Sequence, residues 1–167
     1  MKTIKSIMLF AISLIMISSC TSENKNQQQS INQLQNKDVM EKLEKERIEN
    51  LLGEYKKSLN TSDAKLAKSL YAKDGIFMQS GAPSAIGSDN ILKSYEFIFS
   101  QIQLNIEFFI DEILVEGDFA FATTSSKGTT LIRATTQTIP EENRELFVFE
   151  KADGNWKIAR YMFNKTK

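Results

Sequence analysis

Histidine is absent from this chain of 167 residues, and cysteine occurs only once. Without histidine the chain lacks the commonest general base and the commonest transition-metal ligand. A single cysteine excludes an internal disulfide bond, a cysteine–histidine pair and a thiolate zinc site. The sequence therefore predicts neither a metal ion nor another cofactor, and it closes the most common routes to enzymatic catalysis.

The chain also has no excess of charge, because 21 Lys and Arg residues balance 21 Asp and Glu residues. Two of the basic residues lie within the first 19 positions, which leaves the remainder with 19 basic and 21 acidic side chains. Binding to nucleic acid needs a clustered basic face. We therefore expect no nucleic-acid partner. The hydrophobic fraction of 41% and the charged fraction of 25% are typical of a globular protein, with room for one ordinary domain.

The longest apolar run lies near the N-terminus, at Ile7–Ile17, behind two lysines. A run of 11 residues spans about half a bilayer, so we expect a cleaved signal peptide rather than a permanent transmembrane helix. The run ends in Ile-Ser-Ser-Cys20, which resembles the lipobox of bacterial lipoproteins. That resemblance implies acylation of Cys20, a membrane as partner, and an exported, membrane-anchored lipoprotein of a bacterial cell envelope. The alternative is an ordinary secretory signal with an incidental cysteine.

The segment that follows is polar and rich in Gln and Asn up to about residue 37. It has too little apolar surface to offset the entropy of ordering, so we interpret it as a flexible tether. The predicted organisation is a signal peptide at 1–19, a tether at 20–37 and one domain at 38–167.

The body of the chain changes its hydrophobic period from helical to strand-like near residue 103. Apolar stripes predict helices at 38–60, 61–71 and 90–102, with Tyr55 on the stripe of the first. Strands are expected at 76–79, from 104 to the turn at Gly117, at 119–131, and in a hairpin over 143–164. A change of parity near Asp111 predicts a β-bulge. Helices followed by a run of strands favour an α+β domain, with the helices on one face of a curved sheet.

The last hairpin has a clear alternation on either side of its Asp153-Gly154 turn. Because strand side chains alternate with period two, each strand presents one set of residues to the core. The sets expected to face inward are Glu145, Phe147 and Phe149 in the first strand and Ala159, Tyr161 and Phe163 in the second. The set expected on the outer face, beneath a dimer partner, is Trp156, Ile158, Arg160 and Met162.

Several short motifs resemble a known family. They are YKKSLN at 55–60, LYAKDG at 70–75, IPEENRELFV at 139–148 and DGNWKIARYMF at 153–163. Together they resemble the SnoaL-like branch of the nuclear-transport-factor-2-like, or ketosteroid-isomerase-like, superfamily over about residues 43–164, and the last two resemble its SgcJ/EcaC sub-family. The resemblance implies a cone-shaped roll of cystatin-like topology, in which about three N-terminal helices pack on a strongly bent, mostly antiparallel sheet. It also implies a pocket between these layers and a homodimer formed through the outer sheet face.

Isomerases of this superfamily combine a carboxylate base with a tyrosine and a protonated carboxylic acid. Matched by motif, the tyrosine corresponds to Tyr55, the base position to Gln79 and the acid to the neighbourhood of Glu145. A glutamine amide cannot take up a proton at neutral pH, so the chain departs from the family's pattern at the position that matters most for catalysis.

The expected ligand pocket comprises Tyr55, Gln79, Thr123, Glu145, Tyr161 and Phe163. Two placements of Glu145 fit the sequence: buried in the pocket with a raised pKa, or paired with Arg144 or Arg160 near the sheet edge. We interpret the protein as a lipid-anchored binder of a small, mostly apolar molecule without a competent general base. Two alternatives stay open. One is an isomerase- or polyketide-cyclase-type enzyme with Tyr55 and Glu145 as its catalytic candidates, and the other is a protein-interaction module whose pocket is filled.

Overall fold

A computed structural model describes residues 20–166, with side chains from Asn32 onward. The predicted signal peptide lies outside these residues. The helices in this range are α1 (Cys20–Asn60), α2 (Ala64–Ser69) and α3 (Ser88–Gln101). The strands are β1 (Tyr71–Met78), β2 (Ala85–Ile86), β3 (Ile102–Glu116), β4 (Phe119–Ile132), β5 (Gln137–Ala152) and β6 (Asn155–Lys165). The chain divides into two compact units, Met1–Met40 and Glu41–Lys167.

In the first unit, the backbone is helical from Cys20 onward. The helix predicted to begin at residue 38 was therefore too short at its N-terminal end. No glycine or proline interrupts residues 21–37, and the glutamines, the single glutamate and the lysines there are good helix formers. None of the helices that the structure describes is long and apolar enough to cross a membrane.

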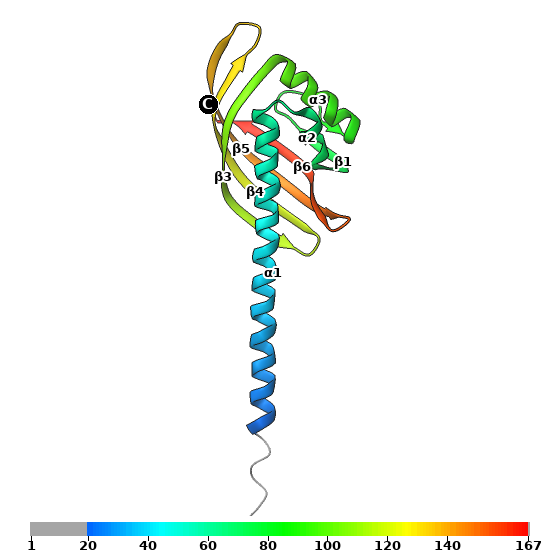
Figure 1. The fold of residues 1–167 in the computed structure, drawn as a ribbon, viewed down its shortest axis with the longest axis vertical. Helices are drawn as coiled ribbons and strands as arrows, with labels where there is room; N and C mark the ends of the chain where they lie inside the picture. Colours follow the sequence, from blue (N-terminus) through cyan, green and yellow to red (C-terminus); the bar gives the residue numbers. More distant parts are fainter. Residues whose placement is uncertain (1–19, 167) are drawn as a thin grey trace, which may run out of the picture. The chain divides into compact units, whose positions relative to one another are not determined.

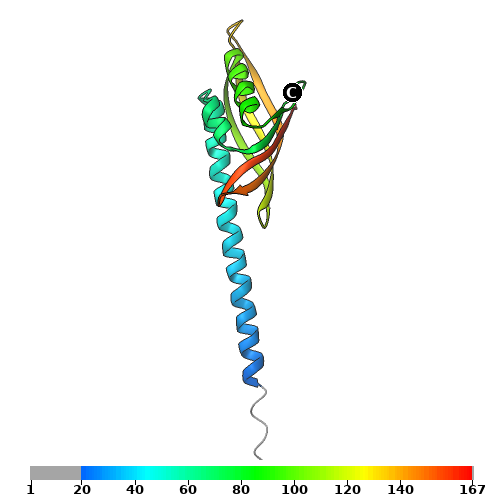
Figure 2. The same ribbon diagram turned by 90° about the vertical axis from the view of Figure 1, so that its right-hand side faces the viewer.

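The second unit consists of a six-stranded sheet with helices on one side (Figures 1 and 2). The strand order is β2-β1-β6-β5-β4-β3, in which β1 runs parallel to β6 and the other neighbouring pairs are antiparallel. We call the face that the helices cover the inner face and the opposite one the outer face. This arrangement confirms the predicted α+β class.

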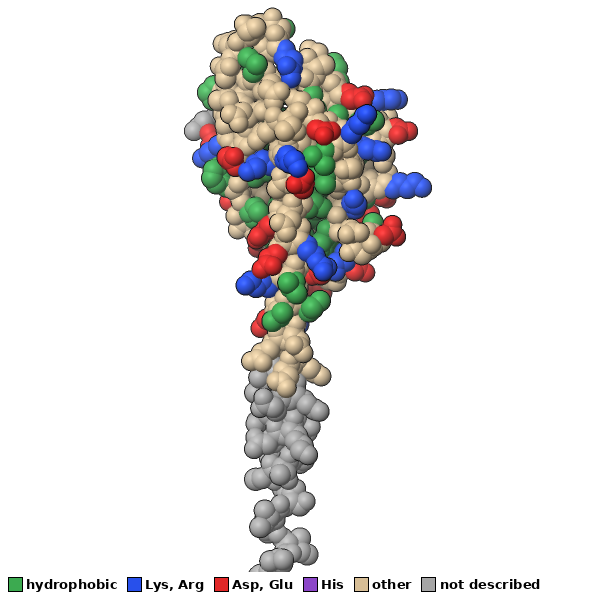
Figure 3. All heavy atoms as spheres, viewed as in Figure 1, with side chains coloured by type: hydrophobic (Ala, Val, Ile, Leu, Met, Phe, Trp, Pro, Cys, Tyr) green, Lys and Arg blue, Asp and Glu red, His purple; other side chains and the backbone are tan. Residues whose placement is uncertain are grey.

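The core lies between the inner face and the helices. The buried stripe of α1 comprises Ile48, Leu51, Leu52, Tyr55 and Leu59, and α3 adds Ile91, Tyr95 and Phe99. Burying each such side chain contributes about 1.5–3 kcal/mol. This burial holds the helices on the sheet. Charged side chains of both signs are interspersed over the face that carries α1 in Figure 3.

Besides a register shift in β1 between Tyr71 and Ile76, two β-bulges set which residues of the long strands face inward. The first lies in β3 between Ile110 and Glu112, as the change of parity predicted. The second, in the β5–β6 pairing, leaves Ala159 as an extra residue between Ile158 and Arg160. This second bulge was not predicted, and it reverses the parity of β6 on one side.

The prediction that Trp156 and Ile158 lie on the outer face was therefore wrong. Ile158 is fully buried in the core, and the Trp156 indole Nε1 donates a hydrogen bond of 2.7 Å to a carboxylate oxygen of Glu44 on α1. Lys151 pairs with the same carboxylate at 3.1 Å. This cluster attaches α1 to the last hairpin. Met162, beyond the bulge, is exposed on the outer face as expected.

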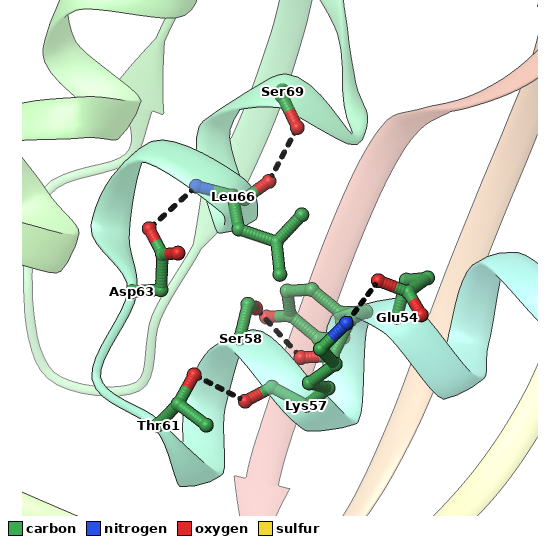
Figure 4. Close-up of polar contacts among 8 residues, drawn as sticks. Glu54, Lys57, Ser58, Thr61, Asp63, Leu66 and Ser69 are labelled. Atoms are coloured by element: carbon green, nitrogen blue, oxygen red, sulfur yellow. Dashed lines mark hydrogen bonds and ion pairs between the residues drawn. The ribbon is translucent and has the colours of Figure 1, made fainter.

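The turn between α1 and α2 joins the helices to the bent edge of the sheet. The Asp63 carboxylate accepts from the Leu66 backbone N–H at 2.9 Å, which caps α2 (Figure 4). The Asn60 amide forms two hydrogen bonds to the backbone of Ile106 in β3, at 2.8 and 2.9 Å. The neighbouring strand passes close by at Gly128, where an added Cβ would lie 2.1 Å from the carbonyl oxygen of Asn105. Only glycine fits this approach, so the bend of the sheet depends on it.

Candidate functional site

All four tyrosines of the chain lie together in the core. The hydroxyl of Tyr95 on α3 is hydrogen-bonded to the hydroxyl of Tyr55 at 2.5 Å and to that of Tyr71 at 2.8 Å. The Tyr55 ring also packs edge-on against Tyr161, with ring centroids 5.3 Å apart. Burial raises the pKa of each of these hydroxyls well above its ordinary value, so the tyrosines stay protonated. The cluster supplies hydrogen-bond donors rather than a base.

Glu145 lies on the inner face of β5, directly opposite Thr124 of β4 and Phe163 of β6. Only 6% of its surface is exposed. The Thr124 hydroxyl donates a hydrogen bond of 2.5 Å to its carboxyl group. Burial raises the pKa of Glu145 and the negative charge of Asp111 acts in the same direction, while hydrogen bonds from Ser126 and Thr124 offset part of the rise.

Glu145 does not form the ion pair with Arg144 or Arg160 that was its other placement compatible with the sequence. No ion pair among the described side chains involves it. Arg144, the next residue, is exposed, and the guanidinium of Arg160 donates to the carbonyl of Ala159. A buried carboxyl group without a cation favours its neutral form, which donates a hydrogen bond.

Four further polar side chains lie on the inner face near Glu145, and none was predicted. They are Ser126 and Thr130 of β4 and Glu141 and Asn143 of β5, each at most 7% exposed. With Thr124 and Glu145 we call these residues the inner polar set. Their signal was present in the sequence, because Thr124 and Ser126, and Glu141, Asn143 and Glu145, recur at the period of two that the neighbouring apolar residues follow.

The inner polar set is linked by hydrogen bonds between the two strands. The Thr130 hydroxyl and the Lys165 ammonium donate to one oxygen of Glu141, at 2.8 and 3.1 Å. The Asn143 amide nitrogen donates to the other oxygen at 3.0 Å and to the Ser126 hydroxyl at 3.3 Å. Burial raises the pKa of Glu141, but these hydrogen bonds outweigh it and hold that pKa below the ordinary value. The pKa values of two buried carboxyl groups, four residues apart on one strand, are thus shifted in opposite directions.

The structure brings most of the predicted pocket residues to one face. Tyr55, Glu145, Tyr161 and Phe163 are all directed to the inner side, and stacked rings connect Tyr161 to Phe163 at 5.8 Å. Phe163 is only partly buried, so the inner face approaches solvent next to Glu145. Gln79 follows the end of β1, two residues after the buried Phe77, and is partly buried.

Thr123, also predicted to line the pocket, is paired with Leu146 rather than with Glu145, so its side chain lies on the outer face. A groove of about 260 Å³ is lined by Thr123, Thr124 and Glu145, together with Asp111, Arg144, Leu146, Met162 and Asn164. Its neighbour Thr124 takes the inner position. A shift of one residue is enough to change the face of a strand residue.

Comparisons with known proteins identify the family of this fold. The SnoaL-like domain family matches residues 48–163. The chain belongs to this SnoaL-like family.

Similar solved structures include a ketosteroid isomerase-like protein from Erwinia carotovora atroseptica, 30% identical, with a TM-score of 0.69 over 72% of this chain and 94% of that one. A nuclear transport factor 2-like superfamily protein from Salmonella enterica is 22% identical, with a TM-score of 0.66 over 74% of this chain and 91% of that one. A hexachlorocyclohexane dehydrochlorinase is 13% identical, with a TM-score of 0.68 over 78% and 90%. The last two show the fold alone. No curated protein matches the chain.

Proposed function

We propose that this SnoaL-like domain binds a small, uncharged organic molecule on its inner face. The observation that carries the proposal is the placement of Glu145, a buried carboxyl group without a cation, beside the partly exposed ring of Phe163. An aromatic wall with a few polar groups at one end is the usual composition of a small-molecule site. The aromatic side chains on the inner face contact the apolar body of the ligand, and the inner polar set binds its polar end.

Binding without proton abstraction fits the chemistry of the residues that surround the site. The position of the family's base is occupied by Gln79, whose amide cannot take up a proton. Burial raises the pKa of Glu145, which favours its neutral form, and it also raises the pKa of the tyrosine hydroxyls, which stay protonated.

A second candidate is an isomerase- or polyketide-cyclase-type enzyme, and one observation favours it. A chain of tyrosine hydroxyls and a neutral carboxyl group on the same face resemble the donors that stabilise a developing oxyanion. Under this alternative, Tyr55→Phe abolishes turnover of a substrate and leaves its binding nearly intact. Under the binding proposal, the variant shows no turnover to lose.

The experiment that tests the proposal is native mass spectrometry of the purified full-length chain. We expect a co-purifying molecule of small mass that Glu145→Leu displaces and that Glu150→Leu, a substitution outside the inner polar set, does not. A chain that carries no small molecule, and takes up none from a lipid and metabolite extract, contradicts the proposal and favours a protein-interaction module with a filled pocket.

We further propose that the domain is exported and held at a membrane of the cell envelope by an acylated Cys20. Two or more acyl chains are enough for stable attachment, because each buried methylene contributes about 0.8 kcal/mol. Cys20→Ala should move the chain from the detergent phase to the aqueous phase in a phase-separation assay, whereas Thr21→Ala should not. A Cys20→Ala variant that stays in the detergent phase contradicts the anchor.

A further inference from the structure

The Asn143 amide is held in one orientation by its neighbours. Its nitrogen donates to the Glu141 carboxylate at 3.0 Å and to the Ser126 hydroxyl at 3.3 Å. A rotated amide would place its oxygen against Glu141, which the ammonium of Lys165 helps to keep ionised and which can then only accept. Two acceptors would face each other, so the amide nitrogen must point to Glu141.

This orientation leaves the amide oxygen, Oδ1, without a partner. Among the buried side-chain nitrogen and oxygen atoms that the structure describes, this oxygen is the one that forms no hydrogen bond. Asn143 is only 7% exposed, so water does not freely solvate the oxygen. Buried acceptors are normally paired, and an orphan at a fixed position indicates that something else supplies the donor.

Glu145 lies two residues further along β5 and on the same face, about 7 Å away along the strand. Its carboxyl group receives a hydrogen bond from Thr124 and has no cation beside it. The inner polar set therefore presents one free acceptor, at Asn143, and one buried carboxyl group without a cation, at Glu145, which donates in its neutral form.

The charges of the set select against ionic ligands. An anion would meet the carboxylate of Glu141 and the orphan oxygen of Asn143, both of which repel it. A cation would find its natural partner already occupied, because Glu141 is paired with Lys165 at 3.1 Å and bonded to Thr130 and Asn143. The set has no unpaired charge that would offset the desolvation of an ion.

We infer that the polar end of the ligand is an uncharged group that both donates and accepts, such as a primary or secondary amide or an alcohol. Its N–H or O–H donates to Asn143 Oδ1, and its oxygen accepts from Glu145. This inference rests on the proposed function and adds the chemical class of the ligand to it.

The test compares four probes that share a phenyl ring: benzamide, N,N-dimethylbenzamide, benzylamine and benzoate. Each is titrated into the full-length chain and its dissociation constant is measured by calorimetry or ligand-detected NMR. We expect benzamide to bind at least about tenfold more tightly than N,N-dimethylbenzamide, which lacks the N–H, because a site built for a donor rejects an analogue without one. Benzylamine and benzoate should bind more weakly than benzamide.

Asn143→Leu should remove the preference for benzamide over its dimethyl analogue, whereas Arg144→Leu, on the outer face, should keep it. The comparison among probes on the unaltered protein stands even if Asn143→Leu does not fold. Equal binding of the two amides overturns the inference about the ligand's polar end. Tightest binding by benzylamine or benzoate overturns it as well. Both outcomes leave the proposed binding function in place. Failure of all four probes to bind contradicts both.

Discussion

Glu145 and Glu141 show how two like residues on one strand acquire pKa values shifted in opposite directions. Glu141 is surrounded by donors from Thr130, Asn143 and Lys165. Glu145 has hydroxyl groups and aromatic rings around it but no cation. Asn143 lies between them on the same face and donates to Glu141. The difference in pKa arises from the neighbours of single side chains, so single substitutions can test it.

Stability should depend on pH through Glu145. Its pKa in the folded state is above its ordinary value of 4.5, so folding favours the protonated form. The stability it contributes is present below that ordinary value and is lost as pH rises through the folded-state pKa. Glu145→Gln, which stays neutral, should therefore raise the free energy of unfolding at pH 7 and change it little at pH 3.5, as measured by urea denaturation.

Glu44→Gln is the matched control, because burial opposes ionisation of Glu44 but hydrogen bonds from Lys151 and Trp156 hold its pKa below the ordinary value. Its contribution is present above that value and is lost on acidification, so this substitution should destabilise the fold at pH 7 by about 1–3 kcal/mol. A Glu145→Gln variant less stable than the parent at pH 7 would contradict this assignment of Glu145.

Thr123 and Thr124 are adjacent threonines on opposite faces of β4. Thr124→Val removes the buried hydrogen bond to Glu145 and should cost about 1 kcal/mol or more. Thr123→Val, on the outer face, should stay within about 0.5 kcal/mol of the parent. Chemical denaturation of both variants checks the pair. Equal effects would mean that the register of β4 against β5 differs from the one described.

At the scale of elements, the sequence predicted the order and type of the helices and strands because their apolar periods are long and regular. It missed features that depend on contacts between distant segments. The bulge at Ala159 appears only when β6 is paired with β5, so Trp156 and Ile158 were assigned to the wrong face. Residues 137–142 lie between the strands predicted at 119–131 and 143–164, yet they too pair with β4.

The candidate site was predictable to a similar extent. The matched motifs located Tyr55 and Glu145, whose inner placement follows from helical and strand periods. The free oxygen of Asn143 was not predictable, because it depends on Glu141 being ionised by Lys165 from another strand. Which side chains meet across a sheet depends on the register of its strands. That register cannot be read from the sequence until the positions of the bulges are known.

The bend of β3 and β4 over the helices depends on one glycine. An added Cβ at Gly128 would lie 2.1 Å from the carbonyl oxygen of Asn105, so Gly128→Ala should destabilise the domain by about 3 kcal/mol or prevent folding. Gly53, within α1, has nothing within 4 Å of an added Cβ. Gly53→Ala should stabilise the domain by about 0.5–1 kcal/mol. Thermal unfolding of the two variants measures both effects, and a neutral Gly128→Ala would contradict the close packing of these strands.

At the scale of the whole molecule, the outer face of the sheet carries an apolar surface away from the inner polar set. Its members, which we call the outer apolar patch, are Leu114, Phe121, Leu146, Val148 and Met162. Exposed apolar surface of this kind favours association. We propose that a second copy of the chain covers it, in line with the dimer implied by the family resemblance.

Leu146→Glu places a charge in the outer apolar patch and should convert a dimer into a monomer in light scattering coupled to size-exclusion chromatography. Glu112→Lys, on the same face at the edge strand, is a control for the effect of an altered charge and should leave the dimer intact. A monomeric parent protein, or a Leu146→Glu variant that remains dimeric, would contradict this use of the outer face.

The proposed donor role of Glu145 is tested most directly by measuring the pKa of its carboxyl group. The carboxyl carbon is titrated by ¹³C NMR, and the Glu145→Gln variant assigns its signal. We predict a midpoint above 4.5, the ordinary value, for Glu145 and a midpoint below 4.5 for Glu141. A Glu145 midpoint at or below 4.5 would mean that the inner face holds an ordinary carboxylate, and the proposed donor to the ligand would not exist.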